Sequence, residues 1–172
     1  EKAWKAGDTL VQKDLANTLK RVRDFGMKGF YEGETAQLIV AEMKRGKGLI
    51  SYEDLKNYTA KEREAIRFPY KEYTIITMPL PSSGGLIIQQ ALKILESREL
   101  AKMGFQTPAS VQLVAEVERR AYADRAAFMG DEDFVKVPVK TLVSADYLNE
   151  RMKSFVPGKA GKSVEIKEGN IP

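Results

Sequence analysis

The segment Met78-Pro79-Leu80-Pro81-Ser82-Ser83-Gly84-Gly85 carries residue types that could line a reactive site. Prolines favour an extended backbone, serine hydroxyls can cap the start of a helix, and glycines let another backbone or a substrate come close. Ser82, Ser83, Gly84 and Gly85 are therefore candidates for a loop that lines a substrate cavity. The alternative is a helix N-terminus that needs caps and a tight turn. The spaced glycines and the lysine of a phosphate-binding P-loop are absent.

A second group of polar residues, Ala121-Tyr122-Ala123-Asp124-Arg125, lies near the end of a long predicted helix. Asp124 and Arg125 are neighbours in the sequence, so their side chains point in different directions on a helix. We therefore expect each to have its own partner. The pattern indicates a structural motif of Tyr122, Asp124 and Arg125, in which an ion-pair network holds the loop that follows.

Three acidic side chains follow in Gly130-Asp131-Glu132-Asp133-Phe134. Calcium loops use such spacing, but the complete EF-hand pattern is absent. The segment is better explained as a helix-terminating turn, with Asp131 and Asp133 in structural roles and Phe134 and Val137 anchored in the core. We predict no metal site.

The amino-acid composition limits the chemistry that the chain can perform. With no cysteine and no histidine, it has no thiolate nucleophile, disulfide, zinc site of the usual Cys/His kind, or Ser-His-Asp triad. Glu96, Glu116 and Glu118 could pair as a general acid and base, but nothing in their spacing selects them, and we expect them to be solvated. We predict no cofactor.

Charge and hydropathy argue against nucleic-acid and membrane partners. The net charge is +4, from 28 basic and 24 acidic side chains that are interleaved without a block of like charges. No apolar run is long enough to span a membrane. The sequence shows no signal peptide and begins with Glu1, so we expect a processed product or an excised piece.

Hydrophobic periodicity and turn residues predict the secondary structure. We expect an irregular segment before the first helix, a turn at residues 29–33, and a bend at residues 70–73 between the strands of a β-hairpin. Apolar residues on nearly every side of 86–95 predict a helix buried within a larger structure. The predicted helices cover residues 13–25, 34–45, 51–57, 86–95, 108–129 and 144–155, and the predicted strands cover residues 58–69 and 74–78.

The last part of the chain differs in composition from the rest. Residues 157–172 are rich in Gly, Lys and Pro and show no period, which is typical of a mobile tail. We therefore predict a partial domain over residues 1–156 and a flexible tail over residues 157–172.

These motifs together resemble the gamma-glutamyltranspeptidase family, C-terminal half of the large subunit. Two departures are Leu80 and Glu132, which stand where the family usually has proline. Seven pieces match in order along the chain. They are Gly7 through Ala16, Gly29-Phe30-Tyr31-Glu32-Gly33, Gly48-Leu49-Ile50-Ser51 with Asp54-Leu55 and Tyr58, Arg63-Glu64 with Tyr70, Met78 to Gly85, Ala121 to Arg125, and Gly130-Asp131 through Pro138.

The resemblance implies a fold and an activity for the parent protein. The expected fold class is α+β, a helix-rich fragment with a small antiparallel β-hairpin that is part of an αββα N-terminal-nucleophile hydrolase sandwich. The parent enzyme would transfer or hydrolyse the γ-glutamyl group of glutathione or a related amide. A threonine outside this chain, exposed by autocatalytic cleavage after residues 157–172, would be the nucleophile. No catalytic residue is therefore assigned here, and the fragment alone is expected to be inactive.

The resemblance also implies partners and a location. The small subunit of the same precursor would form a heterodimer with this chain, and a periplasmic or secreted location is expected. Two alternatives stay open. One is a related acylase, either a cephalosporin acylase or a poly-γ-glutamate depolymerase, and the other is a non-catalytic helical interaction module.

Overall fold

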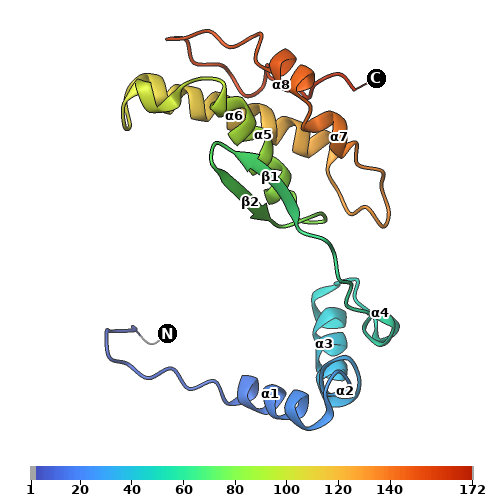
Figure 1. The fold of residues 1–172 in the computed structure, drawn as a ribbon. Helices are drawn as coiled ribbons and strands as arrows, with labels where there is room; N and C mark the ends of the chain where they lie inside the picture. The colour runs from blue at the N-terminus through green and yellow to red at the C-terminus, as the bar shows by residue number, and fades with distance from the viewer. Residues whose placement is uncertain (1–2, 172) are drawn as a thin grey trace. The chain divides into compact units, whose positions relative to one another are not determined.

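The computed structural model describes residues 3–171, which form two compact units divided after Glu62 (Figure 1). The described residues of the first unit contain helices and connecting segments. The second unit combines helices with a two-stranded antiparallel sheet. The chain is thus helix-rich with one small sheet, as the sequence predicts.

The first unit begins with an irregular segment and continues through four helices. The helix α1 ends where predicted, at Gly26, whose φ of 58° is in the left-handed region that suits glycine. Ser51 and Asp54 form the capping box that starts the last helix. The four helices are α1 (Lys13–Phe25), α2 (Lys28–Tyr31), α3 (Gly33–Gly46) and α4 (Tyr52–Asn57).

A close approach of backbones joins α1 to α2, and the side chain of Thr35 at the start of α3 binds both. A Cβ on Gly29 would overlap the carbonyl of Arg21, so only glycine fits there. The Thr35 hydroxyl donates to the carbonyl of Gly29 at 2.8 Å and accepts from Nε of Arg21 at 2.9 Å. In contrast, α1 has no buried residue, and its apolar Leu15 and Leu19 are exposed within this unit.

The hairpin of the second unit consists of β1 (Ile66–Tyr70) and β2 (Tyr73–Thr77), with Phe68 opposite Ile75. Phe68 is buried and its neighbours in β1 are exposed, which is the alternation of a strand with one covered face. That face packs against α5 (Gly84–Glu96). Because the described sheet has two strands, each has one unpaired edge.

The core of the second unit lies where α5 packs against α6 (Pro108–Phe128) (Figure 1). The α6 helix starts where predicted, since the Thr107 hydroxyl accepts from the amide of Ser110 and Pro108 occupies the first turn. The buried apolar residues of this core are Leu80, Leu86, Ile94, Leu95, Leu113, Val117, Val137, Leu142, Tyr147, Leu148 and Met152.

Three short elements complete the second unit. They are the 3₁₀ helix η1 (Leu100–Met103), α7 (Val139–Leu142) and α8 (Ala145–Arg151). The helix α8 contributes Tyr147 and Leu148 to the core and is capped by the Ser144 hydroxyl. After α8 the chain returns along α6.

Several sequence predictions are wrong in detail. The turn predicted at residues 29–33 is largely the one-turn helix α2, and η1 and α7 were not predicted because four residues show no period. The last helix ends at Arg151 rather than Phe155. The Arg151 carbonyl accepts a hydrogen bond from the Arg120 side chain instead of from a helical amide, and residues 152–155 form tight turns. Phe134 is 86% exposed, whereas Val137 is buried as predicted.

Candidate functional site

The loop between β2 and α5 contains the predicted cavity residues. Its Leu80–Pro81 peptide bond is cis, and Leu80 is buried in the core. A Cβ on Gly85 would overlap the carbonyl oxygen of Met78, so Gly85 lets the helix start directly against the end of the strand. Gly84 has no such neighbour, since only Ser82 Oγ lies near, at 3.7 Å.

The hydroxyl of Ser83 joins this loop to α6. Ser83 is the N-cap residue of α5, but its side chain makes no capping hydrogen bond, contrary to the capping role considered from the sequence. Instead Nε of Arg125 donates to Ser83 Oγ at 2.8 Å. Two of the motifs singled out in the sequence are therefore in direct contact, 42 residues apart along the chain.

The acidic turn after α6 is held by an arginine from the start of the second unit. Arg63 donates to Asp133 Oδ2 at 2.8 Å, and the same guanidinium nitrogen lies 3.6 Å from Asp131 Oδ1. The amide of Asp133 also donates to Asp131 Oδ1 at 3.0 Å. Arg63 thus binds both carboxylates. Within residues 3–171 no group of three or more His, Cys, Asp or Glu side chains is placed to hold a metal ion.

Asp124 is buried at the centre of a polar network. Its carboxylate accepts from Gln90 at 3.1 Å and from the amide of Gly169 at 3.1 Å, and it pairs with Nε of Arg151 at 3.0 Å. Burial raises the pKa of the neighbouring Tyr147 hydroxyl, and the negative charge of Asp124 raises it further. Asp124 therefore links α5, α8 and the C-terminal segment, while Tyr122 is exposed.

A second buried pair, Glu116 and Arg120, was missed by the sequence analysis, which expected Glu116 to be solvated. The two side chains are 4% and 2% exposed, and Arg120 donates to Glu116 Oε2 at 2.6 Å. Arg120 also donates to the Arg151 carbonyl at 2.7 Å and to Ser154 Oγ at 2.8 Å. The i,i+4 spacing was the available signal, but such pairs usually lie on the surface.

The environment of Glu116 favours its charged form. Burial raises the pKa of its carboxyl, but hydrogen bonds from Arg120 and from the amide of Gly161, with the charges of Arg120 and Arg119, lower it by more. The pKa therefore lies below its usual value, and the carboxylate is charged near neutral pH.

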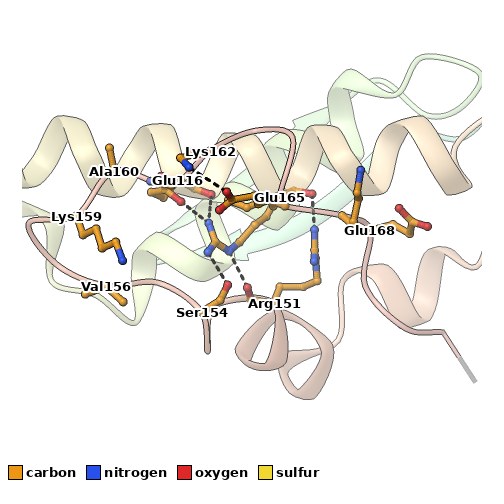
Figure 2. Close-up of a pocket in the computed structure, with 13 residues that line it drawn as sticks. Glu116, Arg151, Ser154, Val156, Lys159, Ala160, Lys162, Glu165 and Glu168 are labelled. Carbon is orange, nitrogen blue, oxygen red and sulfur yellow. Dashed lines mark hydrogen bonds and ion pairs between the residues drawn. The ribbon is translucent and has the colours of Figure 1, made fainter.

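A cavity of about 520 Å³ lies between α6, α8 and the C-terminal segment (Figure 2). Its walls include Glu116, Arg151 and Ser154, together with lysines of the segment such as Lys159 and Lys162. Three of the cations that line it are paired: Lys162 with Glu165 at 3.2 Å, Arg151 with Asp124, and Arg120 with Glu116. Ion pairs therefore neutralise part of the charge that lines the cavity, to which Lys159 and Lys167 also contribute.

The described residues offer structural contacts rather than a reactive pair. The hydroxyl of Ser83 accepts from a guanidinium, which stays protonated in proteins and cannot act as a base. Asp124 and Glu116 are each engaged by arginine and by a backbone amide.

None of the helices within residues 3–171 is both long enough and apolar enough to cross a membrane.

Comparison with known proteins places the chain in one class of enzymes. The sequence model of the gamma-glutamyltranspeptidase family matches residues 1–170, and the chain belongs to this family. It is 41% identical over 170 residues to the glutathione hydrolase proenzyme of Pseudomonas aeruginosa, covering 98% of this chain and 30% of that protein. The chain thus spans about a third of the length of this relative.

Solved structures and a second kind of relative agree with this assignment. The gamma-glutamyltranspeptidase of Helicobacter pylori superimposes with a TM-score of 0.83 at 41% identity, over 94% of this chain and 46% of that one. The acylase ACY 1 proenzyme of Pseudomonas sp. strain SE83 is 41% identical over 168 residues, covering 93% of this chain and 30% of that protein. The family consists of enzymes, and this chain corresponds to a segment of its members.

Proposed function

We propose that residues 1–172 are a scaffold segment of a gamma-glutamyltranspeptidase that transfers or hydrolyses the γ-glutamyl group of glutathione and related amides. The match of the family model to residues 1–170 carries this proposal. In it, the nucleophile is the N-terminal threonine of a small subunit that is made from the same precursor and lies outside this chain. The complete enzyme would be a heterodimer in the periplasm or outside the cell.

The contacts within the second unit support a scaffolding role. Asp124 ties three segments together, and Arg63 holds the acidic turn. Exposed apolar side chains on and beside the hairpin, Ile76 and Met78, together with its unpaired strand edges, fit a sheet that continues in other parts of the parent protein. In the proposed αββα sandwich, the hairpin would join that larger sheet.

The loop with Ser82, Ser83, Gly84 and Gly85 is proposed to line the substrate cavity of the complete enzyme. Arg125 would hold this loop through the hydroxyl of Ser83, so that the loop keeps one shape when substrate enters. The roles proposed for Tyr122, Asp124, Arg125, Asp131 and Asp133 are structural. None of these side chains would react with the substrate.

The proposal is tested by comparing the parent protein with the isolated chain. Purified parent protein should turn over a γ-glutamyl anilide, and residues 1–172 should not. Edman sequencing of the parent should find a second N-terminus at a threonine. Turnover by residues 1–172 alone would refute the scaffolding role, and an uncut parent that lacks turnover would refute the assignment of activity.

A related acylase is the second candidate, because the acylase of strain SE83 has the same 41% identity to this chain as the glutathione hydrolase of Pseudomonas aeruginosa. The same resemblance leaves a poly-γ-glutamate depolymerase open. The parent protein should therefore be assayed with glutathione, a cephalosporin side-chain amide and poly-γ-glutamate. The highest kcat/KM among the three substrates decides between these activities.

A further inference from the structure

One face of α6 binds the backbone of the C-terminal segment. Gln112, Glu116, Arg120 and Asp124 follow one another at intervals of four residues, so their side chains lie on the same face of the helix. Together these four residues are called the polar stripe. Residues 156–169, which lie beside the stripe (Figure 2), are called the strap.

Three side chains of the stripe accept hydrogen bonds from amides of three glycines in the strap. Gln112 Oε1 accepts from Gly158 at 2.8 Å, and its amide nitrogen donates to the carbonyls of Val156 and Lys159 at 3.0 and 2.9 Å. Glu116 Oε1 accepts from Gly161 at 2.7 Å. Asp124 Oδ1 accepts from Gly169 at 3.1 Å. The three glycines follow one another along the strap in the same order as their partners along the stripe, so the two segments run in the same direction.

The lengths of the two segments explain the cavity between them. From residue 112 to residue 124, α6 rises about 18 Å, whereas the strap from residue 158 to 169 could reach about 36 Å if extended. Most of the excess length lies between the second and third clamps, where the strap makes a turn at residues 162–165 and lines part of the cavity of about 520 Å³. Residues 162–168 are therefore held at both ends, by the Glu116 clamp at Gly161 and by the Asp124 clamp at Gly169.

Polar contacts rather than apolar burial hold the strap. Between residues 156 and 170, only Gly161, Ile166 and Gly169 are half-buried, and the others are exposed. The next apolar anchor is Ile171, which packs against the core. The two carboxylate clamps, Glu116 and Asp124, accept charge-assisted hydrogen bonds, which are the stronger kind. None of the buried apolar core residues lies within the strap, so losing a clamp should loosen the strap more than the core.

We propose that Glu116 and Asp124 are positioning residues for maturation of the precursor, because they fix the strap that leads towards the cleavage site. This step rests on the proposed function. Cleavage chemistry requires the reacting atoms to be held within about 0.5 Å of the productive geometry. Since Gly169 is the last glycine clamped, the Asp124 clamp should matter more for cleavage than the Gln112 clamp, which holds the far end of the strap.

The test follows hydrogen exchange of the strap and self-cleavage of the full-length precursor in the same samples. Replacing a clamp, as in Glu116→Gln or Asp124→Asn, should speed exchange of strap amides about ten-fold or more, because a hydrogen bond to a charged group is lost. Cleavage should slow most for Asp124→Asn, less for Glu116→Gln, and least for Gln112→Ala. Far-ultraviolet circular dichroism checks that each variant is folded.

Two strap variants keep the test valid if a buried charge change disturbs the fold. A Cβ on Gly169 would lie 2.5 Å from the Tyr147 hydroxyl, and one on Gly161 would lie 2.8 Å from the Glu116 carboxylate oxygens, so Gly169→Ala and Gly161→Ala crowd the clamps from the other side. Glu118→Gln on the exposed side of α6 and Ala160→Ser in the strap are the matched controls, which should behave as wild type.

Each outcome is decisive. Faster strap exchange with slower cleavage in the clamp variants, and neither change in the controls, supports the inference. Unchanged hydrogen exchange in the clamp variants would refute the claim that Glu116 and Asp124 hold the strap. Faster exchange with unchanged cleavage would refute their role in positioning the cleavage site. A wild-type precursor that never cleaves refutes the proposed function instead, because strap exchange is measured without cleavage.

Discussion

Removing the arginine of the buried Glu116–Arg120 pair should destabilise the second unit strongly. In Arg120→Met, a side chain of similar length but no charge replaces a guanidinium that is 2% exposed and makes four hydrogen bonds. The carboxylate of Glu116 stays buried, with only the amide of Gly161 and Arg119, 3.5 Å away, as remaining partners. The Arg151 carbonyl and the Ser154 hydroxyl each lose a donor.

The magnitude follows from the charge that is left behind. Breaking a buried ion pair by removing one partner typically costs about 3–5 kcal/mol, because an uncompensated charge remains buried. Removing both charges in Glu116→Gln/Arg120→Met avoids that penalty, and such replacements are often close to neutral. We therefore expect the double variant to regain at least about 2 kcal/mol relative to Arg120→Met alone.

Urea unfolding of the 172-residue chain, followed by circular dichroism, measures these free energies. The control is Arg119→Ala, which removes a partly exposed guanidinium that lies 3.5 Å from the same carboxylate and should cost less than about 1 kcal/mol. If Arg120→Met lies within about 1 kcal/mol of wild type, or if the double variant is as unstable as the single one, the burial argument is refuted.

Three further predictions use the same chain. Gly85→Ala should lower the free energy of unfolding by about 1–3 kcal/mol in urea titrations because its Cβ overlaps a backbone carbonyl, whereas Gly84→Ala should change it little; equal effects would contradict the close approach. The pKa of Glu116 is lowered on folding, so its ionisation contributes fully to the free energy of unfolding above its ordinary pKa of 4.5, and this contribution is lost as the pH falls towards the lowered pKa. Urea unfolding midpoints measured between neutral and acidic pH should show this loss in wild type and a smaller loss in Glu116→Gln. A double-mutant cycle of Ser83→Ala and Arg125→Ala should give a coupling energy of about 0.5–1.5 kcal/mol at this exposed bond, and zero coupling would remove Arg125 as the anchor of the loop.

Local signals in the sequence predicted most of the secondary structure. The glycine after Phe25, the capping box at Ser51 and the Thr107-Pro108 start each fixed an element boundary within a residue of the observed one. These boundaries are predictable because caps act through residues adjacent in sequence. Phe134 was misplaced because the sequence shows that a side chain is apolar but not that other parts of the fold cover it.

The polar contacts were harder to predict because they join distant segments. Arg125 meets Ser83 across 42 residues, and Asp124 meets Gly169 across 45, and no local pattern specifies either pair. Glu116 looked like a solvated acid, since the strap and α8 that bury its surroundings lie later in the sequence. The predicted flexibility of residues 157–172 stays a prediction, and the strap exchange experiment measures it directly.

Covalent labelling of the parent protein tests the central claim most directly, namely that the reacting hydroxyl lies outside residues 1–172. The protein is treated with an electrophilic γ-glutamyl analogue, digested, and mapped by mass spectrometry. The account predicts a single label on a threonine at the N-terminus of a second polypeptide and none on peptides from residues 1–172. A label on Ser82 or Ser83 that parallels the loss of activity would contradict it.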